Sequence, residues 1–390
     1  MSSHKKLLEY SSYRRMVKGC LYIVGLWPSE NPKMYYRLLP YAQLLLSTMT
    51  VVAIINFLGH HIKNINVVIK VVSLLTSTSL YILKLCSLTI YRKEILRIHR
   101  ILHRFYMEII DDERLVEFAC KKVKLCHYLG GSMVATVYGS FFLLLVLLPL
   151  INIFIQEIQH HENIKYTLVY PTMYPWNTTS NGLPYRITYV LESLTAFSCC
   201  NVTSGADCLL LFWIFQVTTQ LRAMSYRLNN IRKDDNYDKI IRQNIVQYGI
   251  LMRLRDELQK IYGPIIMYNN SSGAALLCTL IFQLTKASSL TKIQIARFTV
   301  YAIGKTLQVY MYSWPGTLLT TESENYIRSV YLSDWVNQSA CRTSVLMTLS
   351  QKPLTLKICH VSFMSVEMFA VLINTTVSYY LLLKTIAPEP

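Results

Sequence analysis

Long apolar stretches alternate with polar segments along the whole chain. Seven windows stay apolar for the roughly 20 residues that a helix needs to cross a bilayer core about 30 Å thick. Asp, Glu, Lys and Arg are absent from three of these windows and occur only as isolated residues in the other four. The predicted spans are residues 38–58, 65–91, 125–155, 187–219, 262–285, 298–320 and 358–383. The pattern therefore predicts an all-α, polytopic membrane protein with seven transmembrane helices.

Some of the segments between the spans also carry a helical pattern. Ile95, Ile98 and Leu102, just after the second span, repeat at the spacing of one helix face. We expect helical extensions of the spans over residues 92–124, 220–260 and 321–357. Neither an internal repeat nor a low-complexity tract divides the chain. A single membrane domain of residues 1–390 is therefore expected.

The basic residues predict how the chain is oriented. Of the 39 Lys and Arg residues, 29 lie in the N-terminal segment and the three helical extensions, whereas seven lie in the opposite loops. Since cytosolic loops carry the excess of Lys and Arg, we expect the N-terminus in the cytosol and the C-terminus outside. The sequon at Asn177 falls in the long loop 156–186, which this orientation places outside, so an N-glycan is expected there.

Composition narrows the class further. The chain has 390 residues, of which 52% are hydrophobic and only 16% charged, and its formal net charge is +17. A disordered chain is less hydrophobic than this, and a soluble enzyme carries about a quarter charged residues. The basic residues lie between apolar runs rather than on one soluble face, so membrane lipid, and no nucleic acid, is the expected partner.

Reactive groups are sparse. His99 and His103 lie four residues apart on one predicted helix, but no H-E-x-x-H motif accompanies them. The ten cysteines form no C-x-x-C pair, and neither G-x-S-x-G nor a phosphate-binding glycine loop occurs. We therefore expect no enzyme activity, no catalytic residues, no metal site and no cofactor.

Two other classes of membrane protein fit the pattern less well. A G-protein-coupled receptor has its N-terminus outside, and neither loop 156–186 nor segment 220–260 contains the cysteine for that class's usual disulfide. A transporter would show spans broken by Gly and Pro near the midplane, whereas Pro149 and Pro315 lie toward span ends. Both classes remain remote alternatives.

Three stretches of the chain resemble the insect odorant receptor family. They are Val24-Gly25-Leu26-Trp27-Pro28 before the first span, ESENYIRSVYLSDWVNQ at Glu322–Gln338, and FMSVEMFAVLINTTVSYYLLL at Phe363–Leu383. Members of this family have seven spans, a cytosolic N-terminus and an external C-terminus, which agrees with the orientation predicted above. The segment LQVYMYSWPGTL in the sixth span is similar to hymenopteran members.

The motif at the end of the last predicted span distinguishes this chain from related receptor classes. It reads Ser378-Tyr379-Tyr380 instead of the Thr-Tyr-Phe of the Orco co-receptor, and the co-receptor's long cytosolic insertion is absent, so the chain resembles a ligand-tuning subunit. Insect gustatory receptors form homotetrameric channels. Their last span usually carries the motif Thr-Tyr-x-x-x-x-Gln-Phe. That motif does not follow Tyr380, and a gustatory receptor is the nearest alternative.

The resemblance implies an odorant-gated, non-selective cation channel formed as a heterotetramer with the Orco co-receptor. Such channels are expected in the plasma membrane of olfactory sensory neuron dendrites, and the last span of each subunit lines the pore. The resemblance places the gate at Leu382, with Tyr379, Leu383 and Thr385 near the outer end of the same span. A ring of apolar side chains can close a pore by dewetting.

The resemblance also implies a pocket for a small hydrophobic volatile ligand in the outer halves of the second, third, fourth and sixth spans. The residues that this places in the pocket are Val72, Ser73, Thr76, Tyr138, Phe141, Phe142, Leu145, Ser193, Ala196, Phe197, Phe298, Tyr301 and Ala302. Charged residues inside spans are further functional candidates. We expect Glu192 and Lys305 to pair across the bundle or to contact a polar ligand, and Glu367 to bind a cytosolic Arg or Lys.

Overall fold

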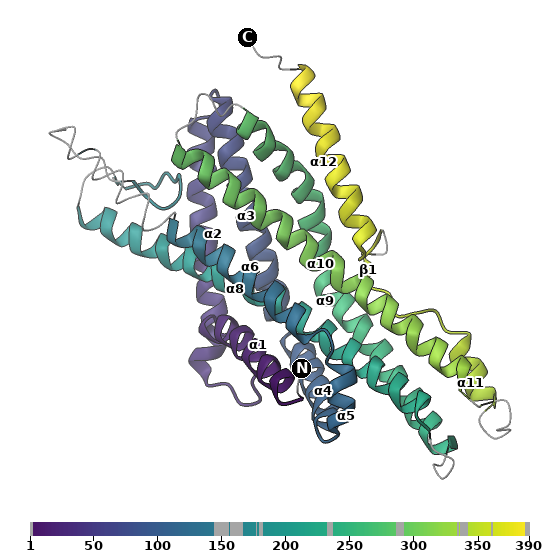
Figure 1. The fold of residues 1–390 in the computed structure, drawn as a ribbon. Coiled ribbons are helices and arrows are strands. Elements are labelled where there is room, and N and C mark those ends of the chain that lie inside the picture. Colours follow the sequence, from purple (N-terminus) through teal and green to yellow (C-terminus); the bar gives the residue numbers. More distant parts are fainter. Residues whose placement is uncertain are drawn as a thin grey trace.

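The computed structural model is built almost entirely of long helices (Figure 1). It describes residues 3–143, 156, 167–176, 178, 182–231, 237–285, 292–333, 335, 342–359 and 362–386. The elements are α1 (Ser3–Ile23), α2 (Met34–His60), α3 (Ile65–Ile90), α4 (Arg92–Ile110), α5 (Glu113–Ala119), α6 (Val123–Phe142), α8 (Leu183–Asn229), α9 (Tyr237–Thr285), α10 (Lys292–Leu332), α11 (Arg342–Leu349), β1 (Lys357–Ile358), β2 (Ser362–Phe363) and α12 (Val366–Ile386). The predicted all-α class is confirmed, and the seven predicted spans fall on α2, α3, α6, α8, α9, α10 and α12.

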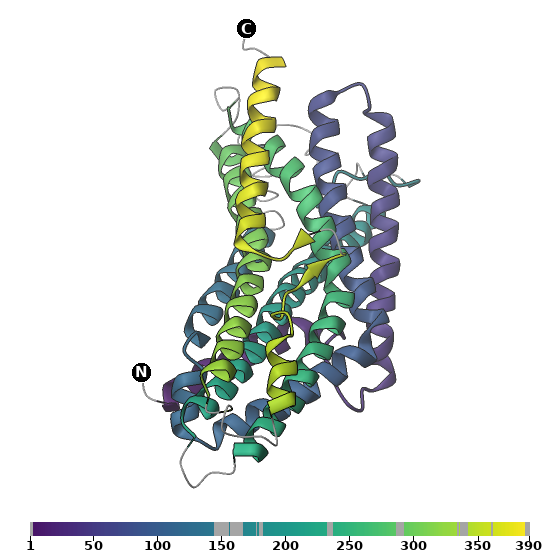
Figure 2. The same ribbon diagram turned by 90° about the vertical axis from the view of Figure 1, so that its right-hand side faces the viewer.

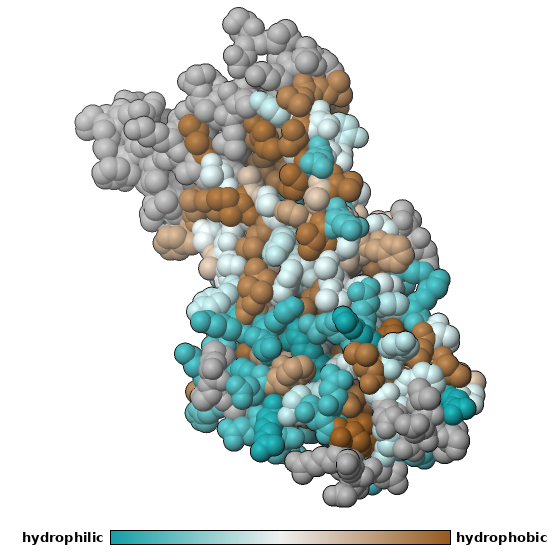
Figure 3. Space-filling view, turned by 45° about the vertical axis from the view of Figure 1, so that its right-hand side comes forward, coloured by the Kyte–Doolittle hydropathy of each residue, from teal (hydrophilic) through white to brown (hydrophobic). Residues whose placement is uncertain are grey.

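Three helices are much longer than a bilayer is thick. α8, α9 and α10 contain 47, 49 and 41 residues, which at 1.5 Å per residue is about 60–75 Å. Figures 1 and 2 show α9 and α10 passing through an upper part, which carries the C-terminus, and a lower part, where α4, α5 and α11 lie. Hydrophobic residues prevail on the upper surface and hydrophilic residues on the lower surface (Figure 3).

By length and apolar composition alone, three helices of the described part qualify to cross a membrane. They are α2, Lys70–Ile90 of α3, and α8. The predicted span in α9 is diluted by a polar run from Asn269 to Ser272. The Ser271 and Ser272 hydroxyls donate to carbonyls of their own helix, Ser272 to that of Tyr268 at 2.6 Å, which is how polar groups are accommodated in a membrane-spanning helix.

The central helix is α8. From Val202 to Ser225 almost every side chain is buried, including Phe212, Trp213 and Phe215, and a helix that is apolar on all sides is one that other helices surround. The N-terminal helix α1 packs on it, and the Tyr13 hydroxyl donates to the Cys208 carbonyl at 3.0 Å.

The Gly-Leu-Trp-Pro motif forms the turn between α1 and α2. Gly25 has φ of 77°, a left-handed conformation that favours glycine, and a Cβ there would lie 2.7 Å from the Tyr36 carbonyl oxygen. The Tyr36 hydroxyl in turn donates to the Trp27 carbonyl at 3.1 Å. The motif therefore holds α1 at a fixed angle to α2.

The last span begins later than the sequence pattern predicts. Strands β1 and β2 (residues 357–358 and 362–363) pair antiparallel, and α12 starts only at Val366, so the expected start at residue 358 is wrong. The apolar residues before the helix misled the prediction. Ile358 and Met364 are apolar because they are buried against the protein, not because they cross the bilayer.

The predicted helical extensions are present in part. In α4 the residues at helical spacing, Ile95, Ile98 and Leu102, are buried. The stretch 92–124 is nevertheless broken into three helices, and the Asp112 carboxylate caps α5 by accepting from the backbone of Arg114 and Leu115. After α10 ends at Leu332, only α11 is helical among the described residues up to 357.

Candidate functional site

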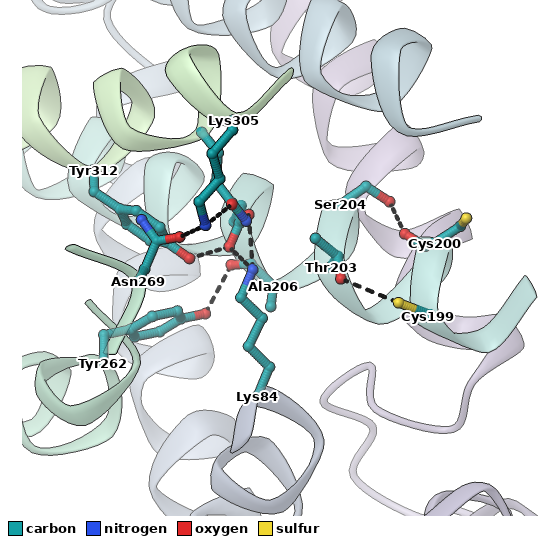
Figure 4. Close-up of polar contacts among 12 residues, drawn as sticks. Lys84, Cys199, Cys200, Thr203, Ser204, Ala206, Tyr262, Asn269, Lys305 and Tyr312 are labelled. Carbon is teal, nitrogen blue, oxygen red and sulfur yellow. Dashed lines mark hydrogen bonds and ion pairs between the residues drawn. The ribbon is translucent and has the colours of Figure 1, made fainter. Parts of the chain in front are cut away.

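A cluster of polar side chains lies buried where four long helices meet (Figure 4). Asp207 of α8 is at its centre. The Lys84 ammonium of α3 lies 2.7 Å from one carboxylate oxygen, and the Gln308 amide of α10 donates to the other at 2.8 Å. The Tyr312 hydroxyl of α10 also donates to this carboxylate. Inside a membrane protein such charges are expected to pair in the bundle interior.

Lys305 extends the cluster to α9. Its ammonium donates to the Asn269 side-chain oxygen at 2.6 Å and to the Gln308 side-chain oxygen at 3.1 Å. Gln308 therefore bridges Asp207 and Lys305, since its amide nitrogen donates to Asp207 and its oxygen accepts from Lys305. The sequence identifies Lys84, Asp207 and Lys305 as charges within spans, but it does not predict that they meet.

The predicted pairing of Glu192 with Lys305 is wrong. The buried Glu192 carboxylate accepts from the Tyr170 backbone N–H at 3.1 Å and from the Thr172 and Tyr174 hydroxyls at 2.6 and 3.1 Å. The outer loop therefore folds back and satisfies this carboxylate. Lys305 shares the level of Asp207, which is 15 residues, about 22 Å, further along α8 than Glu192.

Several candidate pocket residues form contacts between helices, some between α3 and α10 and others between α6 and α8. Between α3 and α10, the Tyr301 hydroxyl forms a hydrogen bond with the Ser77 hydroxyl, one residue beyond the expected Thr76. Between α6 and α8, the Tyr138 hydroxyl donates to the Asn201 side-chain oxygen at 2.8 Å. The rings of Phe141 and Phe197 lie 5.9 Å apart, centroid to centroid.

Other candidates lie elsewhere. Val72 and Phe142 are 46% and 56% exposed, so they lie on the surface of the single chain. The hydroxyls of Ser73, Thr76 and Ser193 donate to carbonyls of their own helices. Ala196 is buried and Ala302 half-buried. Leu145 lies outside the described residues, as does the side chain of Phe298.

One loop residue was missed by sequence reasoning. Tyr170 is half-buried, and its backbone N–H is one of the donors that bind the Glu192 carboxylate. The loop that carries it therefore lies against the outer end of α8. The available signal was the run of aromatic residues in the loop, Tyr170, Tyr174 and Trp176, of which Trp176 donates to the Thr188 hydroxyl at 2.9 Å.

The candidate gate lies on α12. This helix packs mainly on α9 and α10, where Leu372 meets Leu277 and Val309. Tyr379 and Leu382 are 52% and 53% exposed in the single chain, and the side chains of Leu383 and Thr385 lie outside the described part, as does Asn177. Glu367 is exposed and has no ion pair with a described Arg or Lys. This contradicts the expectation that Glu367 binds a cytosolic Arg or Lys.

Acidic and metal-ligating side chains are dispersed. Within the described ranges no three His, Cys, Asp or Glu residues gather in a way that would hold a metal ion. The rings of His99 and His103 stack 6.2 Å apart, and the edge of His99 packs on Trp27. These histidines serve the packing of α4.

Comparison with known proteins gives one consistent result. The family profile described as "7tm Odorant receptor" matches residues 64–377. The chain is 19% identical to Odorant receptor 13a of Drosophila melanogaster over 276 residues, which is 65% of this chain and 66% of that receptor. It is 26% identical to Odorant receptor 10 of Aedes albopictus over 239 residues, 55% of this chain and 63% of that one.

The fold is similar to that of a solved receptor. The insect olfactory receptor OR5 from Machilis hrabei superposes with a TM-score of 0.78 at 12% identity, covering 97% of this chain and 98% of the other. Its complex with eugenol gives the same TM-score at 13% identity, covering 97% and 100%. The motifs, the seven helices and the family profile together show that the chain belongs to the insect odorant receptor family, whose members are channels rather than enzymes.

Proposed function

We propose that this odorant receptor is the ligand-tuning subunit of an odorant-gated, non-selective cation channel formed with the Orco co-receptor. The observation that carries the proposal is the position of α12. Its packing rests mainly on α9 and α10, while apolar residues such as Val371, Leu381 and Leu382 remain exposed in the single chain. A transmembrane helix with this uncovered face is suited to meet equivalent helices around a central pore.

The ligand pocket is proposed between α3, α6, α8 and α10. Support comes from Tyr301 and Tyr138, which join these helices in pairs through Ser77 and Asn201, and from the Phe141 and Phe197 rings, which lie 5.9 Å apart between α6 and α8. Apolar and aromatic walls with few polar groups suit a small hydrophobic ligand. That the relative OR5 was solved in complex with eugenol agrees with this size class.

The gate is proposed at Leu382, with Tyr379, Leu383 and Thr385 near the outer end of the same helix. A ring of leucine side chains expels water when the pore is narrow, and outward movement of α12 rehydrates it. The chain is proposed to act as one membrane domain with its N-terminus in the cytosol. Its expected place is the plasma membrane of olfactory neuron dendrites, and a hymenopteran source is proposed from the sixth span.

Whole-cell current tests this function. Cells that express the chain with and without the co-receptor would be challenged with a diverse panel of volatile compounds. We expect a cation current only with both subunits, lost or shifted in ligand preference by Tyr301→Ala. Ligand-evoked current without the co-receptor would instead support the gustatory-type homotetramer.

A matched pair of variants tests the gate. Leu382→Thr places a hydroxyl in the proposed ring, so we expect a leak current without ligand. Leu381→Thr is the control, because Leu381 is equally exposed, at 54% against 53%, but points about 100° away around the helix. Equal leak currents from the two variants would argue against Leu382 as the gate.

A further inference from the structure

Two hydrogen-bond donors in the buried cluster have no acceptor. A lysine ammonium has three N–H donors, and Lys305 uses two of them on Asn269 and Gln308. The Asn269 side-chain nitrogen has no partner within the described part of the chain. Asn269 is fully buried and Lys305 is 7% exposed. Buried polar groups normally find a partner, so an unpaired donor beside an ammonium is informative.

The orientation of both amides is fixed by their neighbours. Turning the Asn269 amide over would place its NH₂ group against the Lys305 ammonium, two donors facing each other. Gln308 cannot turn either, because its nitrogen serves the Asp207 carboxylate and its oxygen serves Lys305. The free Asn269 donor is therefore a property of the network and not of an arbitrary amide assignment.

The cluster also carries an uncompensated charge. The Asp207 carboxylate is matched by the Lys84 ammonium and further bonded by Gln308 and Tyr312. Lys305 faces only the neutral oxygens of two amides. Two lysines and one aspartate leave one positive charge in a buried place, where an isolated ion is costly.

The position of these donors relates them to the ligand pocket. Lys305 follows Tyr301 by one helical turn on the same face of α10. On α9, Gly273 lies one turn beyond Asn269, and a Cβ at Gly273 would be only in ordinary contact, 3.5 Å, with the Lys305 Cε. Lys305 therefore lies one turn, about 6 Å along the helix axis, from Tyr301, a residue of the proposed pocket.

We propose that Lys305 and Asn269 form a site for one hydrogen-bond acceptor, the carbonyl or carboxylate oxygen of a ligand whose hydrocarbon part lies in the pocket. The proposal rests on the proposed odorant-receptor function. A chloride ion offers the same acceptor chemistry from another source. The site would make the receptor prefer ketones, esters or acids over hydrocarbons of equal length.

The test uses the purified full-length chain in detergent and follows its thermal unfolding midpoint. Asn269→Asp keeps the oxygen that binds Lys305, supplies the missing negative charge and removes the free donor. Lys305→Met removes the cation at similar volume. Ser313→Ala is the control, since Ser313 is buried on the same helix and its hydroxyl donates to the Val309 carbonyl. The probes are 2-heptanone, heptane and chloride exchanged for methanesulfonate.

We expect 2-heptanone to raise the midpoint by about 2 °C in the wild type and in Ser313→Ala, and the rise to be lost in Asn269→Asp and Lys305→Met while any heptane effect is kept. If chloride is the occupant, the midpoint instead falls on exchange for methanesulfonate in the wild type and in Ser313→Ala, but not in Asn269→Asp or Lys305→Met. Responses to both probes that are equal in wild type and Asn269→Asp, or absent, overturn the proposal.

Failure of this site is distinguishable from failure of the proposed function. Currents evoked by the volatile panel in cells with the co-receptor report on the channel itself. If those currents persist in Asn269→Asp with an unchanged order of ligand preference, the chain is an odorant receptor that lacks this acceptor site. If no current is evoked while the ketone-dependent midpoint shift is present, the acceptor site stands without the channel function.

Discussion

At the scale of single residues, the most demanding feature is a fully buried ion pair. Lys84 and Asp207 both have 0% exposed side chains, and taking two charges out of water is favourable only when geometry and further hydrogen bonds compensate. Gln308 and Tyr312 supply those bonds. The pair ties α3 to α8 and makes each partner depend on the other.

Removing one partner of this ion pair should therefore destabilise the fold more than removing both partners. We expect Lys84→Met to destabilise the chain by roughly 3–5 kcal/mol, because the Asp207 carboxylate is then buried without its counter-charge. The double variant Lys84→Met with Asp207→Leu should recover part of that loss. Thermal unfolding in detergent measures both, and a double variant less stable than Lys84→Met would show that the pair itself is not the cause.

A second residue-scale consequence concerns pH at the cytosolic side. Burial, with smaller contributions from Arg14 and His103, lowers the pKa of His99 from 6.5 to about 4. The unfolded chain takes up this proton near pH 6.5 while the folded chain does not, so stability is full above that pH and falls as the pH drops toward 4. The loss is roughly 3 kcal/mol at 1.36 kcal/mol per pH unit.

His99→Phe tests this prediction. The ring keeps its packing against Trp27, which in the wild type meets the His99 ring at 4.9 Å between centroids, but it no longer titrates. We expect the unfolding midpoint of the variant to depend less on pH between 6.5 and 4. A slope as steep as that of the wild type would assign the dependence to other groups, among them His103, whose pKa burial also lowers.

At the scale of elements, the contact between α10 and the start of α12 depends on one glycine. A Cβ on Gly316 would lie 2.0 Å from the Met364 carbonyl oxygen. The backbone would have to move to make room for it. Nearby, the Val366 backbone N–H donates to the Thr317 hydroxyl at 2.9 Å. These contacts hold the first turn of the proposed pore helix against α10.

We expect Gly316→Ala to displace this end of α12 and to alter or abolish ligand-evoked current. Gly249→Ala on α9 is the matched control, because a Cβ there meets nothing within 4 Å and alanine favours the helix. Current amplitude at equal surface expression is the measurement. Normal currents from Gly316→Ala would mean that α12 tolerates a shift at its base.

The loop at 167–176 depends in the same way on one carboxylate. Glu192 accepts three hydrogen bonds from it, so Glu192→Leu should release the loop from the outer end of α8. Hydrogen exchange of the backbone over 167–176 should then rise by at least tenfold, the effect of losing about 1.4 kcal/mol. Ser193→Ala, whose hydroxyl serves only its own helix, should leave exchange unchanged, and a rise in that control would point to a general loosening.

At the scale of the whole molecule, apolar windows that tolerate isolated charged or polar residues were enough to predict the seven helices and the all-α class, although length and apolar composition alone single out only α2, α3 and α8 in the described part. The partners of buried charges were not predictable, because Lys84, Asp207 and Lys305 come from three helices far apart in sequence. The strand pair before α12 and the half-buried Tyr170 were missed for a related reason. Apolar or aromatic residues look alike whether lipid, a neighbouring helix or a pocket surrounds them.

Orientation also belongs to this scale and has a direct test. If loop 156–186 lies outside the cell, Asn177 should carry a glycan, and glycosidase treatment should increase the electrophoretic mobility of the wild type but not of Asn177→Gln. Asn374→Gln is the control, because that sequon lies within α12. A glycosidase shift that persists in Asn177→Gln would place the glycan elsewhere.

The packing of α12 on few other helices has an evolutionary consequence. Because this helix rests mainly on α9 and α10, only the surfaces of those two must stay matched to it. Substitutions on the α3, α6 and α8 walls of the proposed pocket can change which molecule is recognised without altering a surface on which the proposed pore helix mainly packs. A receptor built this way can acquire new ligands one mutation at a time while its channel remains intact.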